Sequence, residues 1–320
     1  MDNQGAGPGP RSVACGLVSA HNPTGRQLEI THGEQLAVVA QVGAALRVYS
    51  VGGRDVVTPF GEDQLPPAYH GMVLLPWPNR LGDGVYTWEG VTYTVPLNEH
   101  APRLTALHGL ACWTRWDVLE HGESAVRLAL DLVPTPGYPW PLHAEVTYAL
   151  SDAGLEVTLA TRNDGATDAP YGSGFHPWLS PGPGSLDECT LRVDARRHVT
   201  TDERLLPTGT EPAEGAWDFT RHRSLAGVAL DDAFVDVVRD AEGLSWIELT
   251  GADGRTAALW SDESMDTWQV CTGDGIPGAH RTGLAAEPMT CVADAFRTGE
   301  RLVRLAPGAA HRVRWGLTLR

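Results

Sequence analysis

Apolar side chains recur at every second position over much of this chain, and that period limits what it can fold into. In residues 142–150, LHAEVTYAL, every second residue is apolar, and the alternation returns in residues 155–159 after the turn-forming SDAG of residues 151–154. Successive side chains of a β-strand point to opposite faces, so a period of two is typical of half-buried strands. The two segments together predict a β-hairpin.

Three more parts of the chain repeat this signal. Residues 85–95, VYTWEGVTYTV, have Glu-Gly at their centre, and an Ala-Asp-Gly turn separates residues 246–250 from residues 256–260. Residues 313–319, VRWGLTL, alternate like a half-buried strand. Closely spaced strands with turns between them predict an all-β sandwich or barrel and not a set of βαβ units.

The chain has 320 residues, of which 42% are hydrophobic, enough for a sizeable core. No linker-like change in composition follows residue 25, so we expect residues 26–320 to form a single domain. Residues 1–25 read as a disordered tail, and their polar, Gly- and Pro-rich start lacks the apolar core of a signal peptide. Helical periodicity is weak, and only residues 203–206 or 220–222 could form a short helical turn.

The formal net charge of −16 narrows the choice of partners. Binding to nucleic acid needs a basic face, and no block of Lys or Arg is present, so we expect no nucleic-acid partner. No apolar run approaches the ~20 residues of a membrane-spanning helix, so we expect no membrane partner. We expect a small-molecule partner and a monomer or homodimer.

The five cysteines are widely spaced and form no CxxC pair. This pattern predicts free, buried thiols in a reducing cytoplasmic compartment, and neither a disulfide framework nor a zinc site. The five are Cys15, Cys112, Cys189, Cys271 and Cys291.

The segment LLPWPNRL, residues 74–81, places Asn79 and Arg80 among prolines and large apolar residues. These apolar neighbours predict that Arg80 is partly buried, and a buried guanidinium needs hydrogen-bond or charge partners. One interpretation is a structural ion pair. The other is a rigid fork that donates hydrogen bonds to sugar hydroxyls, which makes both residues candidates for substrate binding.

Two histidines lie in turn-rich segments. His108 stands between Leu and Gly, and His176 lies in the segment GSGFHPW, residues 172–178. A histidine beside apolar residues is often a packed residue bonded to backbone, but glycines on one side and a proline on the other indicate a shaped loop around His176. Trp178 could be a wall or platform for a sugar, or an ordinary core residue.

Carboxylates supply the remaining candidates. Glu287 lies in the apolar company of AAEPM, residues 285–289, where desolvation would raise its pKa toward the range of a general base. The alternative is a glutamate at a strand end that faces water. Asp231 and Asp232 form an acidic pair, and most such pairs are surface turns.

Several other site types find no support. The chain has no HExxH or HxH metal motif, no glycine-rich nucleotide loop and no GxSxG elbow. We therefore expect neither a metal nor a cofactor. Acid/base chemistry is what remains.

In their order, these segments resemble the aldose 1-epimerase (galactose mutarotase) family from about Leu36 to the C-terminus. Each motif is weak alone, and their number and order make the resemblance specific. The matching pieces are PNRL at residues 78–81, LHGL at 107–110, GFHPW at 174–178, LDDAF at 230–234, QVCTGD at 269–274 and AEP at 286–288.

The resemblance implies a large antiparallel β-sandwich and a cofactor-independent isomerase that interconverts the α and β anomers of a free hexose. By position, Glu287 resembles the family's general base and His176 its general acid. Arg80, His108 and Asp231 match sugar-binding residues, with Asp232 as the neighbour if the alignment slips by one. We expect Glu287 and His176 to flank one pyranose from opposite sides.

One departure places the chain in a divergent branch. Its GFHPW segment differs from the Asn-His pair of well-known galactose mutarotases. Three other functions stay open: a non-catalytic sugar-binding module, a hexose-6-phosphate mutarotase with Arg80 and Arg103 as phosphate ligands, and an epimerase or lyase that acts on another carbohydrate.

Overall fold

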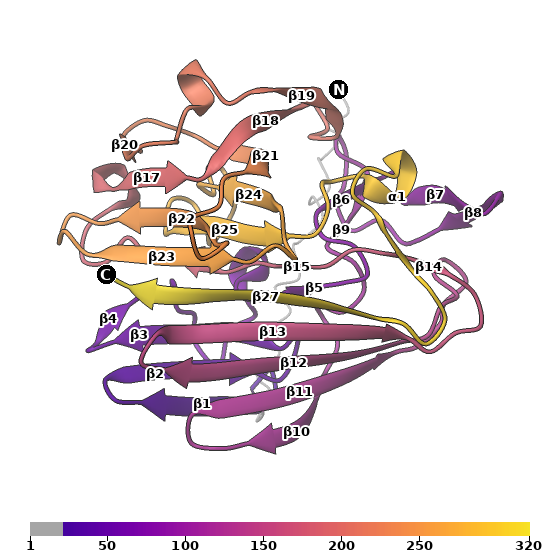
Figure 1. Ribbon diagram of the computed structural model, residues 1–320, viewed down its shortest axis with the longest axis horizontal. Helices are drawn as coiled ribbons and strands as arrows, with labels where there is room; N and C mark the ends of the chain where they lie inside the picture. Colours follow the sequence, from indigo (N-terminus) through magenta and orange to yellow (C-terminus); the bar gives the residue numbers. More distant parts are fainter. Residues whose placement is uncertain (1–21) are drawn as a thin grey trace, which may run out of the picture.

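The computed structural model describes residues 22–320, which are built almost entirely from β-strands (Figure 1). Every strand pair in its sheets is antiparallel, which confirms the expected all-β antiparallel sandwich. Of the expected N-terminal tail, residues 1–21 lie outside the described residues, whereas residues 22–25 form a turn in which Thr24 is buried. No helix in the described residues is long and apolar enough to cross a membrane.

The larger sheet has nine strands, and in Figure 1 its strand β27 runs between β13 and β23. In spatial order its strands are β10 (Asp117–His121), β11 (Ala125–Leu132), β12 (Leu142–Ser151), β13 (Gly154–Asn163), β27 (Ala310–Leu319), β23 (Thr256–Ser261), β22 (Ser245–Thr250), β17 (Thr190–Val193) and β20 (Arg223–Ser224).

The second sheet has eight strands and supports the candidate site. Its order is β19 (Pro207–Pro212), β18 (Ala195–Thr201), β21 (Asp231–Val237), β24 (Thr267–Cys271), β25 (Leu284–Met289), β15 (Gly174–Phe175) and β5 (Val73–Leu74), with β16 (Trp178–Leu179) also paired to β25.

Smaller units complete the described fold. A four-stranded sheet contains β1 (Gln27–His32), β2 (Gln35–Ala40), β3 (Ala45–Val51) and β4 (Arg54–Asp55). Three strand pairs are β6 (Arg80–Gly82) with β9 (Thr105–Leu107), β7 (Val85–Trp88) with β8 (Val91–Thr94), and β14 (Ala169–Tyr171) with β26 (Val303–Leu305). The helices are short: α1 (Ala295–Thr298) and the 3₁₀ turns η1 (Pro67–Tyr69), η2 (Leu186–Glu188) and η3 (Gly215–Trp217).

The expected hairpins are confirmed, and one local expectation is wrong. β12 pairs with β13 around the predicted turn, β7 with β8, and β22 with β23. Residues 203–206 and 220–222 are not helical, because the backbone N–H groups of Arg204 and Thr220 donate hydrogen bonds to the Asp202 and Asp218 carboxylates and hold the two segments in turns or bends. The four described cysteines are free and buried as expected, and Cys15 lies outside the described residues.

The core lies between the two large sheets. Phe175 of the eight-stranded sheet packs on Trp315 of β27, with ring centroids 5.1 Å apart, and both side chains are at most 1% exposed. Alternate residues of each strand point into this layer, so the intervening residues of the eight-stranded sheet are free to line a site on its other face.

Replacement of Leu317 by alanine tests this core. Leu317 of β27 is 0% exposed, so Leu317→Ala should lower the free energy of unfolding by about 2–5 kcal/mol through lost burial and the remaining cavity. The matched control is Leu65→Ala, at a position 62% exposed, which should change it by no more than about 0.5 kcal/mol. Chemical denaturation followed by Trp fluorescence measures both, and equal effects would contradict this core assignment.

Candidate active site

Glu287 lies on the face of the eight-stranded sheet that is turned away from the core. The strand register places it opposite Gln269 of β24, and places Cys271 opposite Asp231 of β21. Since alternate strand residues share a face, Asp231, Gln269 and Glu287 lie on one side. Their neighbours Val270 and Ala286 belong to the hydrophobic core on the other side.

The same alternation separates the two aspartates. Asp231 accepts a hydrogen bond from Gln269 Nε2 (2.8 Å) and lies 3.6 Å from the Arg80 guanidinium. Asp232 accepts one from His198 Nε2 (2.7 Å) on the opposite face of the strand. Asp231 therefore lines the cavity and Asp232 does not.

His176 stands beside Glu287 on a tightly packed backbone. Its N–H donates to Met72 O (3.0 Å), and its carbonyl accepts from Gly71 N–H (2.8 Å). A Cβ on Gly174 would lie 3.0 Å from the side chains of Pro78 and Met289, so a larger residue there would have to push these neighbours away by a few tenths of an ångström. The loop expected around His176 is thus a short, rigid link between β15 and β16.

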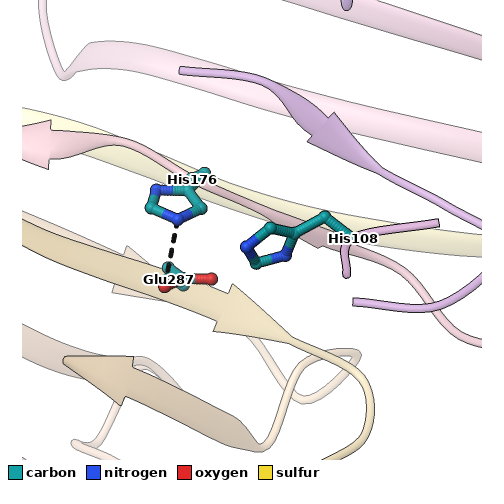
Figure 2. A group of neighbouring side chains, drawn as sticks. All are labelled: His108, His176 and Glu287. Carbon is teal, nitrogen blue, oxygen red and sulfur yellow. Dashed lines mark ion pairs between the residues drawn. The ribbon is translucent and has the colours of Figure 1, made fainter. Parts of the chain in front are cut away.

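His176 Nε2 lies 3.4 Å from Glu287 Oε1, and the exposed fractions of these side chains are 7% and 3% (Figure 2). We call these two residues the acid/base pair. They are side by side, so the expectation that they flank a pyranose from opposite sides is wrong. The ring oxygen and the anomeric hydroxyl of a sugar share one carbon, so two neighbouring groups can serve both atoms from the same side.

Burial sets the protonation of the acid/base pair. Desolvation, reinforced by the like charge of Asp231, raises the pKa of Glu287 well above its ordinary value, although Arg80 lowers it. Desolvation, with smaller contributions from His70 and Arg80, lowers the pKa of His176 to about 3. Because a second proton would leave a buried positive charge and loss of the last proton a buried negative charge, the pair holds one proton over a wide pH range.

Arg80 is held by carboxylates. Its guanidinium donates to both oxygens of Glu99, from Nε at 2.9 Å and from Nη2 at 3.3 Å, and it faces Asp231. Desolvation alone would lower the pKa of Arg80, but the charges of Asp231 and Glu99 raise it. The ion-pair interpretation is therefore confirmed, and the same guanidinium also lines the cavity.

His108 and Asn79 come from the loops next to β9 and β6. The His108 N–H donates to Asn79 O (2.9 Å), and the Asn79 N–H donates to His108 Nδ1 (3.1 Å). The His108 ring packs edge-on against His176, with centroids 5.0 Å apart. Figure 2 shows the His108 ring directed toward the acid/base pair.

Aromatic rings line one side of the site. Trp178 is 1% exposed and stacks on His176 (centroids 5.9 Å apart) and on His70 (4.5 Å), so it is a packed wall and not an open platform. Tyr69 packs edge-on against His108, with centroids 4.6 Å apart. These rings hold both site histidines in place.

The structure brings all seven predicted site residues to one cavity of about 560 Å³, a volume within the usual range for small-molecule sites. The predicted residues that line it are Asn79, Arg80, His108, His176, Trp178, Asp231 and Glu287.

Sequence reasoning missed several contributors to this site. Tyr69 and Glu99 line the cavity, and Gln269 orients Asp231. Glu99 lies in a polar loop without a motif. Gln269 did carry a signal, since it stands two positions before Cys271 on the alternating strand and inside the matching QVCTGD segment.

The nitrogen and oxygen ligand atoms of His108, His176 and Glu287 lie within 4.8 Å of one another, close enough to hold a metal ion. Histidines that bind metals usually donate their second ring N–H to an acceptor. His108 Nδ1 instead receives a hydrogen bond, and His176 Nδ1 has no hydrogen-bond partner among residues 22–320. The hydrogen bonds around this cluster thus favour a proton-transfer site.

Comparisons with solved structures agree with the fold. The GalM/aldose epimerase homologue from C. elegans superposes with a TM-score of 0.81 at 19% sequence identity, over 92% of this chain and 98% of that one. A galactose mutarotase-like protein from Clostridium acetobutylicum gives a TM-score of 0.81 at 18% identity, over 91% and 94% of the two chains.

Sequence comparisons are more specific. The uncharacterized protein YihR of Escherichia coli is 34% identical over 304 residues, which cover 94% of this chain and 96% of YihR. Rat galactose mutarotase is 32% identical over 188 residues, 53% of this chain and 52% of that protein. The family model for aldose 1-epimerase matches residues 26–318. This chain therefore belongs to the aldose 1-epimerase family.

Proposed function

We propose that this protein interconverts the α and β anomers of a free aldose through its ring-opened form. The observation that supports this function best is the acid/base pair, a carboxylate and an imidazole 3.4 Å apart and almost completely buried at one cavity. Mutarotation needs one group that takes a proton from the anomeric hydroxyl and another that gives one to the ring oxygen.

The proton balance of the reaction matches that of the acid/base pair. Ring opening starts from the form of the pair in which the shared proton lies on His176 and Glu287 is ionised. Glu287 takes the proton from the anomeric hydroxyl while His176 donates its Nε2 proton to the ring oxygen, the C1–O5 bond breaks and C1 becomes an aldehyde. After rotation about C1–C2, the ring oxygen attacks the other face of C1. His176 then takes back a proton and Glu287 returns one. The pair holds one proton before and after ring opening, so no net charge enters the buried site.

The other cavity residues would position the sugar. Arg80, His108 and Asn79 offer hydrogen-bond donors or amide groups, and Asp231 offers an acceptor, around the acid/base pair. Since Glu99 and Asp231 hold the Arg80 guanidinium in place, it is pre-oriented for a hydroxyl. The partner implied is a small sugar.

A second candidate substrate is a hexose 6-phosphate. Arg103 favours it, because its Nη1 is buried at the cavity without a hydrogen-bond partner among residues 22–320. The overall charge opposes it, because the cavity carboxylates outnumber its arginines and Arg80 is already paired. The carboxylates are Glu99, Asp231, Asp274 and Glu287, and the arginines are Arg80 and Arg103.

We also propose a reducing, cytoplasmic setting. The four described cysteines are all free and buried, as is usual for thiols in such a compartment.

Removal of the general base tests the activity. Glu287→Gln keeps the shape of the side chain but cannot accept the anomeric proton, so the rate should fall by about 10²–10⁴-fold. Polarimetry on freshly dissolved α-glucose and α-galactose measures it, with Glu123→Gln, an exposed turn residue, as the matched control. Sugar binding without any acceleration by the wild-type protein would instead favour the non-catalytic binding module.

The pH profile tests the acid/base pair. With ordinary pKa values, the acidic limb would belong to Glu287 and the basic limb to His176. Burial of both groups reverses this order. The pair gains a second proton only near the His176 pKa of about 3 and loses its shared proton through the raised pKa of Glu287. We therefore expect kcat/KM to stay flat through pH 6.5, where an exposed histidine would titrate.

Two variants complete this pH test. Asp231→Asn removes the like charge that raises the pKa of Glu287, so it should move the basic limb to lower pH. His176→Asn should abolish the bell shape. An unchanged profile in His176→Asn would remove that residue from the acid role.

Substrate comparison separates the two candidate sugars. We expect a higher kcat/KM for glucose than for glucose 6-phosphate, because a phosphate dianion would meet the excess of carboxylates. Arg103→Met, which keeps an unbranched apolar stem but removes the charge, should change the rate on glucose by less than about threefold. A preference for glucose 6-phosphate that disappears in Arg103→Met would contradict the free-sugar proposal and support the phosphorylated substrate.

A further inference from the structure

Two non-glycine residues with left-handed backbone face each other at the site. Asn79 has φ 56° and His108 has φ 63°. The His108 N–H donates a hydrogen bond to the Asn79 carbonyl, and the Asn79 N–H donates one to the His108 ring. Non-glycine residues rarely adopt this conformation, although asparagine and histidine adopt it more often than most. Such outliers persist only where the surrounding structure holds them, and they concentrate at functional sites.

Packing holds this arrangement firmly. The Asn79 side-chain oxygen accepts a hydrogen bond from the Arg80 N–H (2.8 Å), which fixes the peptide that follows Asn79. The next residue after His108 is Gly109, at φ 74°, where a Cβ would clash with the Leu75 carbonyl. The His108 side chain is 4% exposed in total and packs against Tyr69.

The direction of one hydrogen bond determines where the His108 proton lies. A backbone N–H can only donate, so the Asn79 N–H, 3.1 Å from His108 Nδ1, requires a lone pair on that nitrogen. The neutral ring then carries its proton on Nε2, the nitrogen on the far side from Asn79. A second proton on the ring would break this bond in a buried site that already contains Arg80 and His176.

We propose that the Asn79 backbone N–H locks His108 in its neutral Nε2–H form, so that His108 is a permanent hydrogen-bond donor to a sugar oxygen beside the acid/base pair and cannot bind a metal ion there. The donor role rests on the proposed function, whereas the locked tautomer and the exclusion of metal do not. Asn79 is then a positioning residue that acts through His108.

Exclusion of metal follows from the same bond. To bind a metal, His108 Nε2 must offer its lone pair, and the proton of the neutral ring must move to Nδ1. That proton would point at the Asn79 N–H, so two hydrogen-bond donors would face each other without an acceptor. The His108, His176 and Glu287 cluster would therefore lose one of its three ligands, and the two that remain cannot form a closed site.

Nitrogen NMR of the wild-type protein tests the tautomer directly. Long-range ¹H–¹⁵N spectra distinguish a protonated from an unprotonated ring nitrogen, and the His108 signals are assigned by their loss in the variants below. We expect a protonated Nε2 and an unprotonated Nδ1 at every pH from 5 to 8. A protonated Nδ1, or a doubly protonated ring within this range, would overturn the proposal.

Two variants test the donor role. The amide nitrogen of His108→Gln can reach the position of Nε2, whereas that of His108→Asn lies near Nδ1. We expect kcat/KM of His108→Gln to exceed that of His108→Asn at least tenfold, with an unchanged pH profile. Equal losses in two folded variants would overturn the donor role, and a shifted pH profile in His108→Gln would show that His108 titrates.

Zinc titration of the wild-type protein tests whether the cluster can bind a metal ion, and this test does not depend on enzymatic activity. Calorimetry with ZnCl₂ should show no stoichiometric binding that depends on the cluster. One equivalent of Zn²⁺ that binds to wild type but not to Glu287→Gln would overturn the lock. If the wild-type protein does not speed up mutarotation, the proposed function fails, while the NMR and zinc results still decide the tautomer.

Discussion

The rest of the site depends on the burial of one carboxylate next to one imidazole. Glu287 and His176 are both removed from water, so neither gain of a second proton nor loss of the last one is favourable there, and the pair holds a single proton. Ring opening and closure each require one group that donates a proton and another that accepts one, and the acid/base pair supplies both. Its pKa values follow from burial, and burial follows from the fold.

The fold produces this burial through strand register and through close packing of the backbone. Strand register places Glu287 beside Gln269 and two strands away from Asp231, on the face of the sheet opposite the core. Close packing at Gly174 then brings His176 onto the same face. A shift of one residue in β25 would turn Glu287 into the core and Ala286 toward the cavity, and the pair would be lost.

Electrostatic balance and backbone strain position the remaining side chains of the site. Arg80 is surrounded by Glu99 and Asp231, so a buried cation is satisfied and a donor is pre-oriented at once. Asn79 and His108 adopt unfavourable backbone angles and obtain a ring with a defined proton position. In both cases, an unfavourable local feature, a buried charge or a strained backbone angle, is offset by an interaction that forms only in the folded chain.

The period of two in the sequence was enough to predict an all-β antiparallel fold, since alternation reports directly which strand residues are buried. Motifs and their order also indicated seven of the residues that line the cavity. Sequence could not decide between Asp231 and Asp232, because adjacent strand residues differ only in the face that they occupy.

Tertiary structure alone decided the features that depend on contacts between distant segments. The side-by-side position of Glu287 and His176 results from the pairing of β15 and β16 with β25. The roles of Tyr69 and Glu99, the order of the pKa values and the proton position on His108 all depend on neighbours 19 or more residues away in the chain, for which a local pattern carries no signal.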